Sequence, residues 1–168
     1  MISVGILTIS DSSYRGERED LSGPLIHQMV VERLGAEVKL ESVVPDEVDI
    51  IKSTLMVWSD EVGLDLILTT GGTGFGPRDV TPEATKAVIE REAPGLTEAM
   101  RAKGLEITPH AILSRAVAGI RGRTLIVNLP GSPKAVREDL EVILPALPHG
   151  IELLKGGIGG HEYRSGSG

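Results

Sequence analysis

Four polar segments follow apolar runs that are typical of buried strands: residues 11–13, 45–47, 71–79 and 130–134. They contain glycine, aspartate, serine and a few cations, which are residue types suited to binding an anionic ligand. In an α/β fold, ligands bind beyond the carboxyl ends of the strands. We therefore expect the four segments to meet along one edge of a sheet and to form a single site.

A glycine-rich loop stands at the centre of this expected site. It consists of Gly71, Gly72, Thr73 and Gly74. Glycine lets the backbone adopt positive φ and turn amide groups toward an anion, although a lone loop of this kind also serves as a tight strand-to-helix connection. The segment lacks the Gly-Lys-Ser/Thr ending of a P-loop. Two helices that begin with a capping residue and a proline, at 81–82 and 132–133, favour phosphate binding at the same edge.

Asp46 and Asp79 are the expected metal-binding pair. Taken alone, Asp46 could cap a helix and Asp79 could be a turn residue. Both follow expected strands, however, and strands that are neighbours or separated by one strand would start the carboxylates about 5–10 Å apart. A hydrated Mg²⁺ that also binds phosphate oxygens could span that gap, because Mg²⁺ takes only one or two protein carboxylates.

A few further polar side chains lie near these segments. Arg78 and Lys134 are the cations best placed for phosphate charge. Further candidates are Arg115, Arg121 and Arg123. Ser114 and Asn128 could hydrogen-bond a polar ligand, and capping a strand end is an equal alternative for Asn128. The four histidines are scattered without metal-ligand spacing, so the sequence predicts no zinc site.

The composition is that of an ordinary acidic globular protein. The 168 residues are 40% hydrophobic and 24% charged, with a net charge of −7, whereas nucleic-acid binding normally calls for a basic face. There is no cysteine for a disulfide or a thiolate site. The amino terminus has no signal-peptide pattern, and no apolar run reaches the roughly 20 residues that span a bilayer. We expect a cytoplasmic protein with small-molecule substrates and no nucleic-acid or membrane partner.

The hydrophobic pattern alternates between strands and helices. Strands are expected at 3–9, 37–44, 65–70 and 124–129, and helices at 22–35, 46–61, 81–92, 95–106 and 132–155. Ser22 is expected to cap the first helix. This alternation predicts an α/β sandwich with a mostly parallel sheet and right-handed crossovers. Residues 1–155 are expected to form a single domain, and residues 156–168 a flexible glycine-rich tail.

Several motifs resemble one protein family. They are LTTGGTGFGPRDVTPEAT, VVPDEV, TPHAILSRAVAGIRG and NLPGSPKAV. Together they resemble the molybdopterin-binding (Mog/MoaB) family of molybdenum cofactor biosynthesis. Within that family they are most similar to the molybdopterin adenylyltransferase branch, which includes the G domain of gephyrin-type fusions. The likeness runs from the first strand to about Lys155 and covers nearly the whole chain.

The resemblance implies a three-layer, Rossmann-like α/β fold and a homotrimer. It also implies a nucleotidyltransferase reaction, in which AMP passes from ATP to the terminal phosphate of molybdopterin in the presence of Mg²⁺ and diphosphate is released. A downstream molybdenum-insertion protein is a further expected partner.

The motifs and the resemblance together assign site residues. Asp46 and Asp79 are assigned to catalysis and Mg²⁺ binding. Nucleotide and phosphate contacts are expected for Gly71, Gly72, Thr73, Gly74, Arg78 and Asp11. Molybdopterin contacts are expected for Ser114, Asn128, Pro130, Gly131, Ser132 and Lys134. Ser22 occupies a matching position in the first loop.

Two alternatives stay open. The MoaB-type sister branch shares the fold and most motifs, and it often forms hexamers. A non-catalytic pterin-binding or scaffolding module of the same fold is the other alternative, although the two aspartates and the full glycine loop favour an enzyme. The molybdenum-insertion enzyme is disfavoured, because that activity belongs to a longer multidomain chain.

Overall fold

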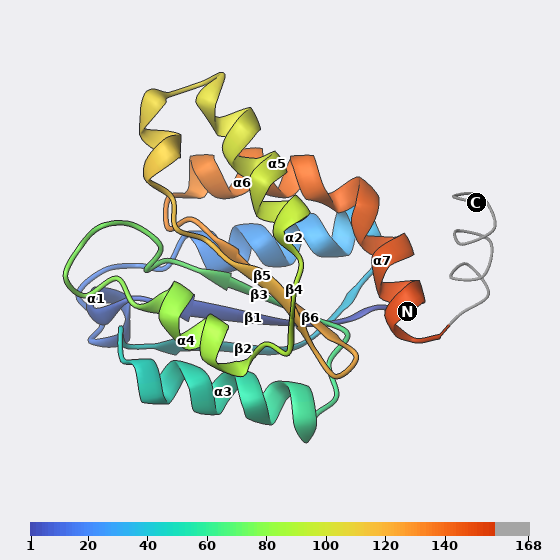
Figure 1. Ribbon diagram of the computed structural model, residues 1–168. Helices are drawn as coiled ribbons and strands as arrows, with labels where there is room; N and C mark the ends of the chain where they lie inside the picture. Colours follow the sequence, from blue (N-terminus) through green and yellow to red (C-terminus); the bar gives the residue numbers. More distant parts are fainter. Residues whose placement is uncertain (157–168) are drawn as a thin grey trace.

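The computed structural model describes residues 1–156, which form one mixed sheet between two layers of helices (Figure 1). The tail expected at 156–168 lies outside the described residues, apart from Gly156.

Six strands form the sheet, in the order β2-β1-β3-β6-β5-β4. The parallel strands are β1 (Ser3–Ile9), β2 (Glu37–Val44), β3 (Leu66–Thr70) and β6 (Thr124–Leu129). The antiparallel pairs involve β5 (Ala118–Arg121), which pairs with β6, and β4 (Arg91–Glu92), which pairs with β5. The expected α/β fold with a mostly parallel sheet is confirmed.

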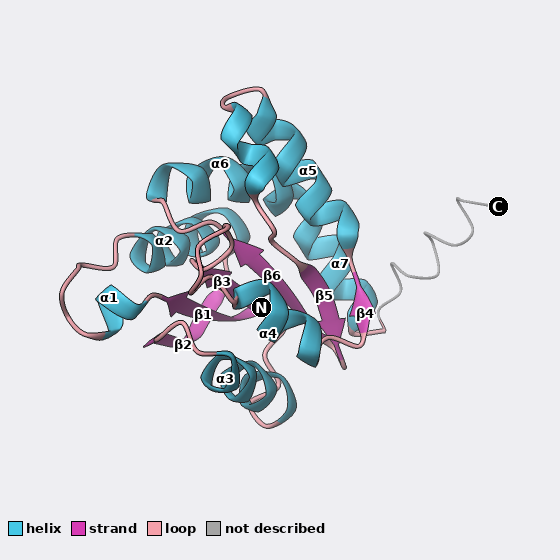
Figure 2. Cartoon of the chain, turned by 60° about the vertical axis from the view of Figure 1, so that its left-hand side comes forward, coloured by secondary structure: helices cyan, strands magenta, loops and turns pink. Residues whose placement is uncertain are grey.

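Helices cover both faces of the sheet (Figure 2). One face carries α2 (Ser22–Leu34), α5 (Pro94–Leu105), α6 (Pro133–Ile143) and α7 (Leu147–Leu154). The other face carries α3 (Val48–Asp60) and α4 (Thr81–Val88). Short helical turns lie in the connections: α1 (Asp11–Tyr14), η1 (Pro109–Leu113) and η2 (Leu144–Ala146). This arrangement is the expected three-layer sandwich.

The central strand β3 shows why the sheet needs both helical layers. All five of its residues are buried, and successive side chains point to opposite faces. Leu66 and Leu68 join the core beneath α2 and α6, whereas Ile67 joins the core beneath α3 and α4. Burial of each such side chain contributes about 1.5–3 kcal/mol. A strand that is apolar on both faces is stable only when each face is covered.

The antiparallel strands are the main departure from the expected elements. The stretch 81–92 was expected to be helical throughout, but α4 ends at Val88 and β4 follows it. β5 and β6 form a tight hairpin in which Gly122 has a φ of +57°. Glycine is favoured at such a turn position because it adopts positive φ without strain. β4 and β5 were not predicted because they are too short, at two and four residues, to produce a clear hydrophobic period in the sequence.

The starts of α2 and α4 also differ from the expectation. Ser22 does not cap α2, because Leu21 holds the N-cap position; the Ser22 hydroxyl donates instead to the carbonyl of Gly131 at 2.7 Å. In the same way Val80 holds the N-cap position of α4, and Thr81 lies inside the helix. Both hydroxyls therefore tie a helix start to a neighbouring loop at the carboxyl edge of the sheet.

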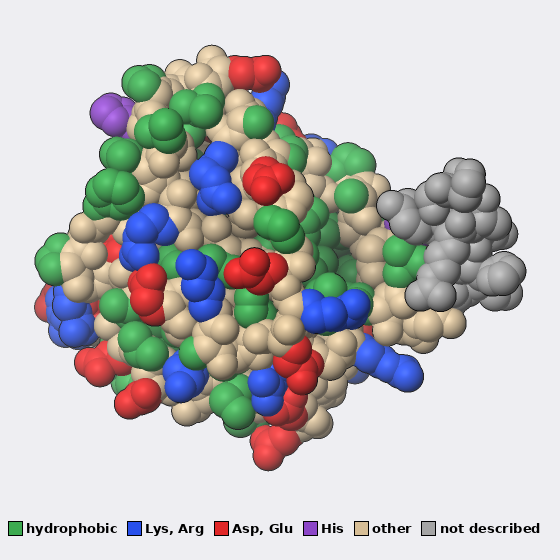
Figure 3. All heavy atoms as spheres, viewed as in Figure 1, with side chains coloured by type: hydrophobic (Ala, Val, Ile, Leu, Met, Phe, Trp, Pro, Cys, Tyr) green, Lys and Arg blue, Asp and Glu red, His purple; other side chains and the backbone are tan. Residues whose placement is uncertain are grey.

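The surface carries charges of both signs. On the face drawn in Figure 3, Lys and Arg side chains intermingle with Asp and Glu side chains. With this mixed pattern, that face has no broad positively charged surface of the kind that binds a nucleic acid. In the described part of the chain, every helix is too short or too polar to traverse a bilayer.

Candidate active site

A cavity of about 380 Å³ opens at the carboxyl ends of β1 and β3. The structure brings residues of all four expected polar segments to its wall. These residues include Ser13, Asp46, Gly71, Gly72, Asp79, Gly131 and Ser132. We refer to this space as the first cavity.

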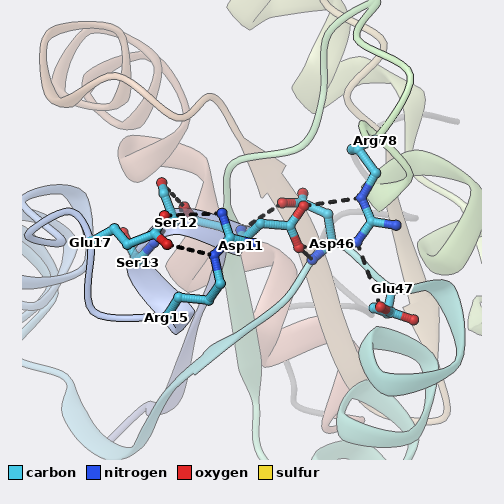
Figure 4. Close-up of polar contacts among 9 residues, drawn as sticks. Asp11, Ser12, Ser13, Arg15, Glu17, Asp46, Glu47 and Arg78 are labelled. Carbon is cyan, nitrogen blue, oxygen red and sulfur yellow. Dashed lines mark hydrogen bonds and ion pairs between the residues drawn. The ribbon is translucent and has the colours of Figure 1, made fainter.

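Asp11 and Asp46 hold the ends of β1 and β2 together (Figure 4). The amide of Asp11 donates to Oδ2 of Asp46 at 2.8 Å, and the amide of Asp46 donates to Oδ1 of Asp11 at 2.9 Å. Arg78 covers the other side of the Asp11 carboxylate with hydrogen bonds of 3.0 and 3.1 Å. Asp46 therefore does not cap α3, which begins without a side-chain cap. The reciprocal bonds fix its carboxylate at the cavity wall.

The two carboxyls of this pair differ in their electrostatics. Hydrogen bonding by the Arg78 guanidinium holds the pKa of Asp11 below its ordinary value. The pKa of Asp46 is raised, first by burial and then by the negative charges of Asp11 and Asp79. Neighbouring carboxylates disfavour one another's charged forms, and a cation between them would offset this repulsion. Asp46 and Asp79 are thus electrostatically prepared for a cation.

Asp79 is held by the glycine-rich turn that precedes it. Its Oδ2 accepts a hydrogen bond of 2.9 Å from the amide of Gly76. A Cβ atom at Gly74 or Gly76 would lie 3.0 or 2.9 Å from the same oxygen, so the backbone approaches closely because these residues are glycines. Within the described residues, Oδ1 of Asp46 and Oδ1 of Asp79 accept no hydrogen bond. Each carboxylate retains one oxygen for a ligand.

The loop 71–74 turns its carbonyls toward the protein and leaves amides free. Thr81 donates from its hydroxyl and its amide to the first two carbonyls, at 2.9 and 3.2 Å. Arg115 donates from its amide and its Nε to the last two, both at 2.8 Å. In the part of the chain that the structure describes, the amides of 72–74 have no acceptor. Free amides on a glycine loop form an anion-binding concavity.

The loop before α6 has the same construction. The hydroxyl of Thr70 donates to the carbonyl of Pro130 at 2.6 Å, and that of Ser22 donates to the carbonyl of Gly131. Ser132 caps α6 through its hydroxyl, as the sequence predicted. Across residues 1–156, the amides of Gly131 and Ser132 find no acceptor. A second set of amides therefore faces the first cavity at a helix amino terminus.

A second cavity, of about 290 Å³, lies on the other side of these two loops. Residues 71–72 and 131–132 line the first cavity, whereas 73–74 and Pro130 line the second. Ser114 also lies on the wall of the second cavity. Four of the residues expected to bind molybdopterin are thus divided between the two cavities: Gly131 and Ser132 line the first, and Ser114 and Pro130 line the second. Two adjacent cavities with a shared wall are suited to a reaction between two substrates.

Two of the expected cations do not line either cavity. Arg78 is engaged by Asp11 and, at 3.5 Å, by Glu47, and its side chain is 59% exposed. The side chain of Lys134 is 82% exposed and lies 4.0 Å from Glu138. Both are ordinary surface ion pairs in this structure, and such pairs stabilise a fold little.

Asn128 lies beneath the loops and away from both cavities. It is fully buried, and its Oδ1 accepts from the amide of Val117 at 3.0 Å. Its Nδ2 donates to the hydroxyls of Thr69 and Thr85 at 3.0 and 2.9 Å. Because these bonds use both amide protons, the side chain has no donor left for a ligand. Of the two roles considered for Asn128, a structural role at the strand end agrees better with these bonds than a role in binding a ligand.

Sequence reasoning missed Asp20 and Arg18, which both line the first cavity. Asp20 accepts from the Thr8 hydroxyl at 2.7 Å and from the Gly23 amide at 3.0 Å. It thereby fastens the first loop to β1 and to the start of α2. Both residues belong to a stretch, RGERED, whose alternating charges look like a solvated loop. Nothing in the pattern distinguishes them from surface charges.

Asp46 and Asp79 are the residues at the first cavity that could hold a metal ion. Among residues 1–156, no group of three or more His, Cys, Asp or Glu side chains surrounds a common metal position. The protein alone therefore offers only a partial ligand set, made of two carboxylates with free oxygens. Mg²⁺ commonly keeps several waters and binds through one or two carboxylates together with substrate phosphates.

Comparison with known proteins agrees with this geometry. Residues 5–149 match the model of a family described as "Probable molybdopterin binding domain". The chain is 46% identical over 156 residues to molybdopterin adenylyltransferase of Helicobacter pylori strain J99, covering 92% of this chain and 89% of that protein. It is also 46% identical over 153 residues to the molybdenum cofactor synthesis protein cinnamon of Drosophila melanogaster. That alignment covers 91% of this chain but 26% of the Drosophila protein, so the chain spans about a quarter of that relative.

Solved structures show the same fold. The crystal structure of MoaB from Thermus thermophilus superposes with a TM-score of 0.87 at 55% identity, covering 93% of this chain and 98% of that one. A structure of MogA superposes with a TM-score of 0.85 at 40% identity, covering 90% and 99%. Since the family model spans most of the sequence, the chain belongs to the family of the probable molybdopterin binding domain.

Proposed function

We propose that the protein is a molybdopterin adenylyltransferase, which transfers AMP from ATP to the terminal phosphate of molybdopterin. The observation that carries this proposal is the loop 71–74. Its carbonyls are occupied by Thr81 and Arg115, and its free amides lie beside Asp46 and Asp79. The named activity of the Helicobacter pylori relative supports the same reaction.

The first cavity takes the triphosphate of ATP in this proposal. The amides of Gly72, Gly131 and Ser132 bind phosphate oxygens there, and Arg18 adds positive charge. Asp46 and Asp79 would hold Mg²⁺ through their free Oδ1 atoms. When bound, Mg²⁺ supplies neutralisation of the charge on the phosphoryl oxygens.

The second cavity takes the pterin, with Ser114 at its wall. The terminal phosphate of molybdopterin then lies near the loops that divide the cavities. One of its oxygens forms a bond to the α-phosphorus of ATP, and the bond to the diphosphate breaks. The attacking phosphate is already ionised at pH 7, so the protein needs no strong base. Its residues contribute positioning and charge neutralisation, which dominate catalysis of phosphoryl transfer.

The test is incubation of the protein with molybdopterin, ATP and Mg²⁺, with adenylylated product and diphosphate as the readouts. We expect turnover in the wild type and a loss of at least about 100-fold in Asp79→Asn, because one carboxylate of the pair disappears. Asp49→Asn is the matched control, since Asp49 is an exposed carboxylate on α3. Near-normal turnover in Asp79→Asn would remove Asp79 from the mechanism.

A protein that binds molybdopterin without turnover would instead be a scaffolding module. The MoaB-type branch is the second candidate, because the chain is 55% identical to the Thermus MoaB structure. Absence of adenylylated product in the wild type, under conditions where a Mog-type enzyme forms it, would favour these alternatives.

The proposal extends to assembly and location. We place the protein in the cytoplasm as a homotrimer that passes its product to a downstream molybdenum-insertion protein. Large apolar side chains are exposed where α5 meets η1: Leu105, Ile107, Ile112 and Leu113. Apolar side chains also gather at the top of the face in Figure 3. Surfaces of this kind support self-association, and sedimentation equilibrium would separate a trimer from a hexamer or a monomer.

A further inference from the structure

The second cavity has a carboxyl group on its wall that the proposed function leaves without a role. Asp139 lies on α6, is partly buried and lines the cavity together with Ser114 and Thr108. In the described structure the Asp139 side chain makes no hydrogen bond and no ion pair. The carboxyl is only partly buried and borders the cavity, where hydrogen bonds from a ligand would replace those from water.

The charged neighbours of Asp139 are engaged elsewhere. Arg101 of α5 lines the same cavity, but its guanidinium donates to two backbone carbonyls and a threonine hydroxyl at 3.4, 3.1 and 3.3 Å. Glu138 precedes Asp139 on the helix, and its side chain lies 4.0 Å from Lys134. Asp139 therefore keeps its full capacity to accept hydrogen bonds from a ligand.

The rest of the cavity is suited to a flat heterocycle. Apolar side chains make up much of the wall: Met100, Ala111, Leu113, Pro130 and Ala135. Small-molecule sites typically combine such walls with a few polar groups that fix the orientation of the ligand. At about 290 Å³, the space can hold a two-ring system.

We propose that Asp139 determines the specificity of the second cavity by accepting hydrogen bonds from adjacent N–H groups on the edge of an aminopyrimidinone ring. The inference rests on the proposed function, in which this cavity takes the pterin. A 2-amino-4-oxopteridine presents its 2-amino group and its ring N3–H side by side. A carboxylate accepts two parallel N–H bonds, so one Asp139 side chain matches this pair of donors.

The experiment compares two stable probes, 2-amino-4-oxopteridine and 2,4-dioxopteridine, which has an oxygen in place of the 2-amino group. Their affinities are measured by fluorescence titration at pH 8 for the wild type and for Asp139→Asn. We expect the wild type to prefer the amino compound by about 10-fold or more, because each charge-assisted hydrogen bond contributes strongly. In Asp139→Asn the preference should fall to within about 3-fold.

Two further variants sharpen the test. Glu141→Gln changes an exposed carboxylate on the same helix, which pairs with Arg33 at 3.5 Å, and should behave like the wild type. Glu138→Gln should keep most of the preference for the amino compound. A preference that survives in Asp139→Asn, or that is lost equally in Glu138→Gln, would overturn the inference.

The outcomes also separate the inference from the proposed function. ATP binding to the first cavity should be unchanged in Asp139→Asn, which shows that the variant is folded. If the wild type adenylylates molybdopterin while Asp139→Asn still prefers the amino compound, the inference alone fails. If the wild type neither adenylylates molybdopterin nor binds either pteridine, the proposed function fails as well.

Discussion

In the proposed site, the loop 71–74 would bind an anion without a lysine, because Thr81 and Arg115 occupy its carbonyls and leave amides free. A P-loop combines free amides with a lysine that adds a point charge. Here the free amides of 72–74 lie beside the carboxylates of Asp46 and Asp79, which suit a metal ion. The positive charge that neutralises the phosphates would therefore come from a metal ion, for which the protein supplies only some of the ligands.

A side chain at Gly72 would disturb both the glycine loop and the Asp46 carboxylate. Its φ is +69°, and a Cβ there would collide with Oγ1 of Thr81 and lie 3.1 Å from Oδ1 of Asp46. We expect Gly72→Ala to destabilise the fold by about 1–2 kcal/mol, since positive φ is strained for alanine. AMP transfer should fall by roughly 10-fold or more, because the free Oδ1 of Asp46 is crowded. Urea denaturation and initial rates measure the two effects.

Gly95→Ala is the control for that substitution. Gly95 lies in the first turn of α5, and a Cβ there meets open space. Alanine should leave the rate unchanged and should be neutral or stabilising by about 0.4–1 kcal/mol. Equal losses in both variants would show that the effect of Gly72→Ala is not specific to the conformation of the glycine loop.

Asp139 also predicts a dependence of stability on pH. Burial, and after it the charge of Glu138, raises the pKa of Asp139 to about 7 against the opposing charge of Arg101. His110 of η1 lines the same cavity. Because the folded-state pKa lies above the unfolded value of about 3.9, the folded state binds the proton more tightly. Its stability therefore falls as the pH rises from about 4 to about 7.

Asp139→Asn removes this titration. We expect the variant to be more stable than the wild type at pH 8, by on the order of 2 kcal/mol, and equal to it at pH 4. Thermal unfolding at the two values measures the difference, with Glu141→Gln as the control on the same helix. A gap of the same size at both pH values would contradict the assignment.

Particular residues show how far sequence reasoning reaches at this scale. Asp46 and Asp79 were predicted together because each follows an apolar run, and strand topology places such positions on one edge. The burial of Asn128 could not be predicted, since its partners come from separate elements and none is near in sequence. Arg18 was missed because a polar loop has no hydrophobic periodicity. The sequence therefore does not indicate whether a charged side chain in the loop points toward a site or toward solvent.

Among the elements, the segment between η1 and β5 acts as a brace for the glycine loop. Arg115 lies in this segment and, besides the two loop carbonyls, donates to the carbonyl of Asp79 at 2.7 Å and to Glu83 of α4 at 2.7 Å. One guanidinium thereby connects the loop, Asp79 and the helix that follows. Arginine suits this position because its planar group carries five donors in a fixed geometry.

Arg115→Lys should impair catalysis without unfolding the protein. Lysine keeps the charge but cannot donate to Gly74, Asp79 and Glu83 at once, so the loop and the carboxylate of Asp79 lose their fixed geometry. We expect kcat to fall roughly 10- to 100-fold, since displacements of about 1 Å have effects of that size. Glu83→Gln is the matched control, because the bonds to both loop carbonyls and to Asp79 persist. Steady-state kinetics with ATP measure both, and unchanged kcat in Arg115→Lys would contradict the brace.

The elements themselves were predicted unevenly. The parallel strands and their helices carry long apolar patterns, and β3 is buried at every position, so the pattern alone identifies them. The antiparallel β4 and β5 have two and four residues. They exist because the edge of β6 offers pairing partners, and this tertiary effect leaves little trace in local sequence.

In the whole molecule, the end of the described chain returns to its beginning. Lys155, just after α7, lies 3.0 Å from Oδ2 of Asp65, which precedes β3. The same carboxylate accepts from the amide of Ser3 at 2.9 Å, and the hydroxyl of Ser3 accepts from the amide of Asp65 at 3.0 Å. These contacts join the amino ends of β1 and β3 to the last helix, at the edge opposite the cavities. These contacts therefore stabilise the fold at a place that is distant from the candidate active site.

Replacing Lys155 should weaken the contacts around Asp65, and the resulting loss of stability should depend on pH. Burial alone would raise the pKa of Asp65, but the hydrogen bonds from Ser3 and the ion pair with Lys155 outweigh it and leave the pKa below its ordinary value. A depressed folded-state pKa gives stability that is present above about pH 4 and is lost as the pH falls through the folded value.

Lys155→Met should therefore be less stable than the wild type at pH 7 by about 1 kcal/mol, because the lysine is half-exposed and the pair is partly screened. The gap should narrow as the pH falls from 7 to 2.5 and Asp65 takes up its proton. Adenylylation should be unaffected, since these contacts lie away from the cavities. Lys39→Met, at an exposed lysine of β2, controls for the loss of one positive charge. A gap that stays constant between pH 7 and pH 2.5 would show that the lysine stabilises the fold through its aliphatic stem and not through Asp65.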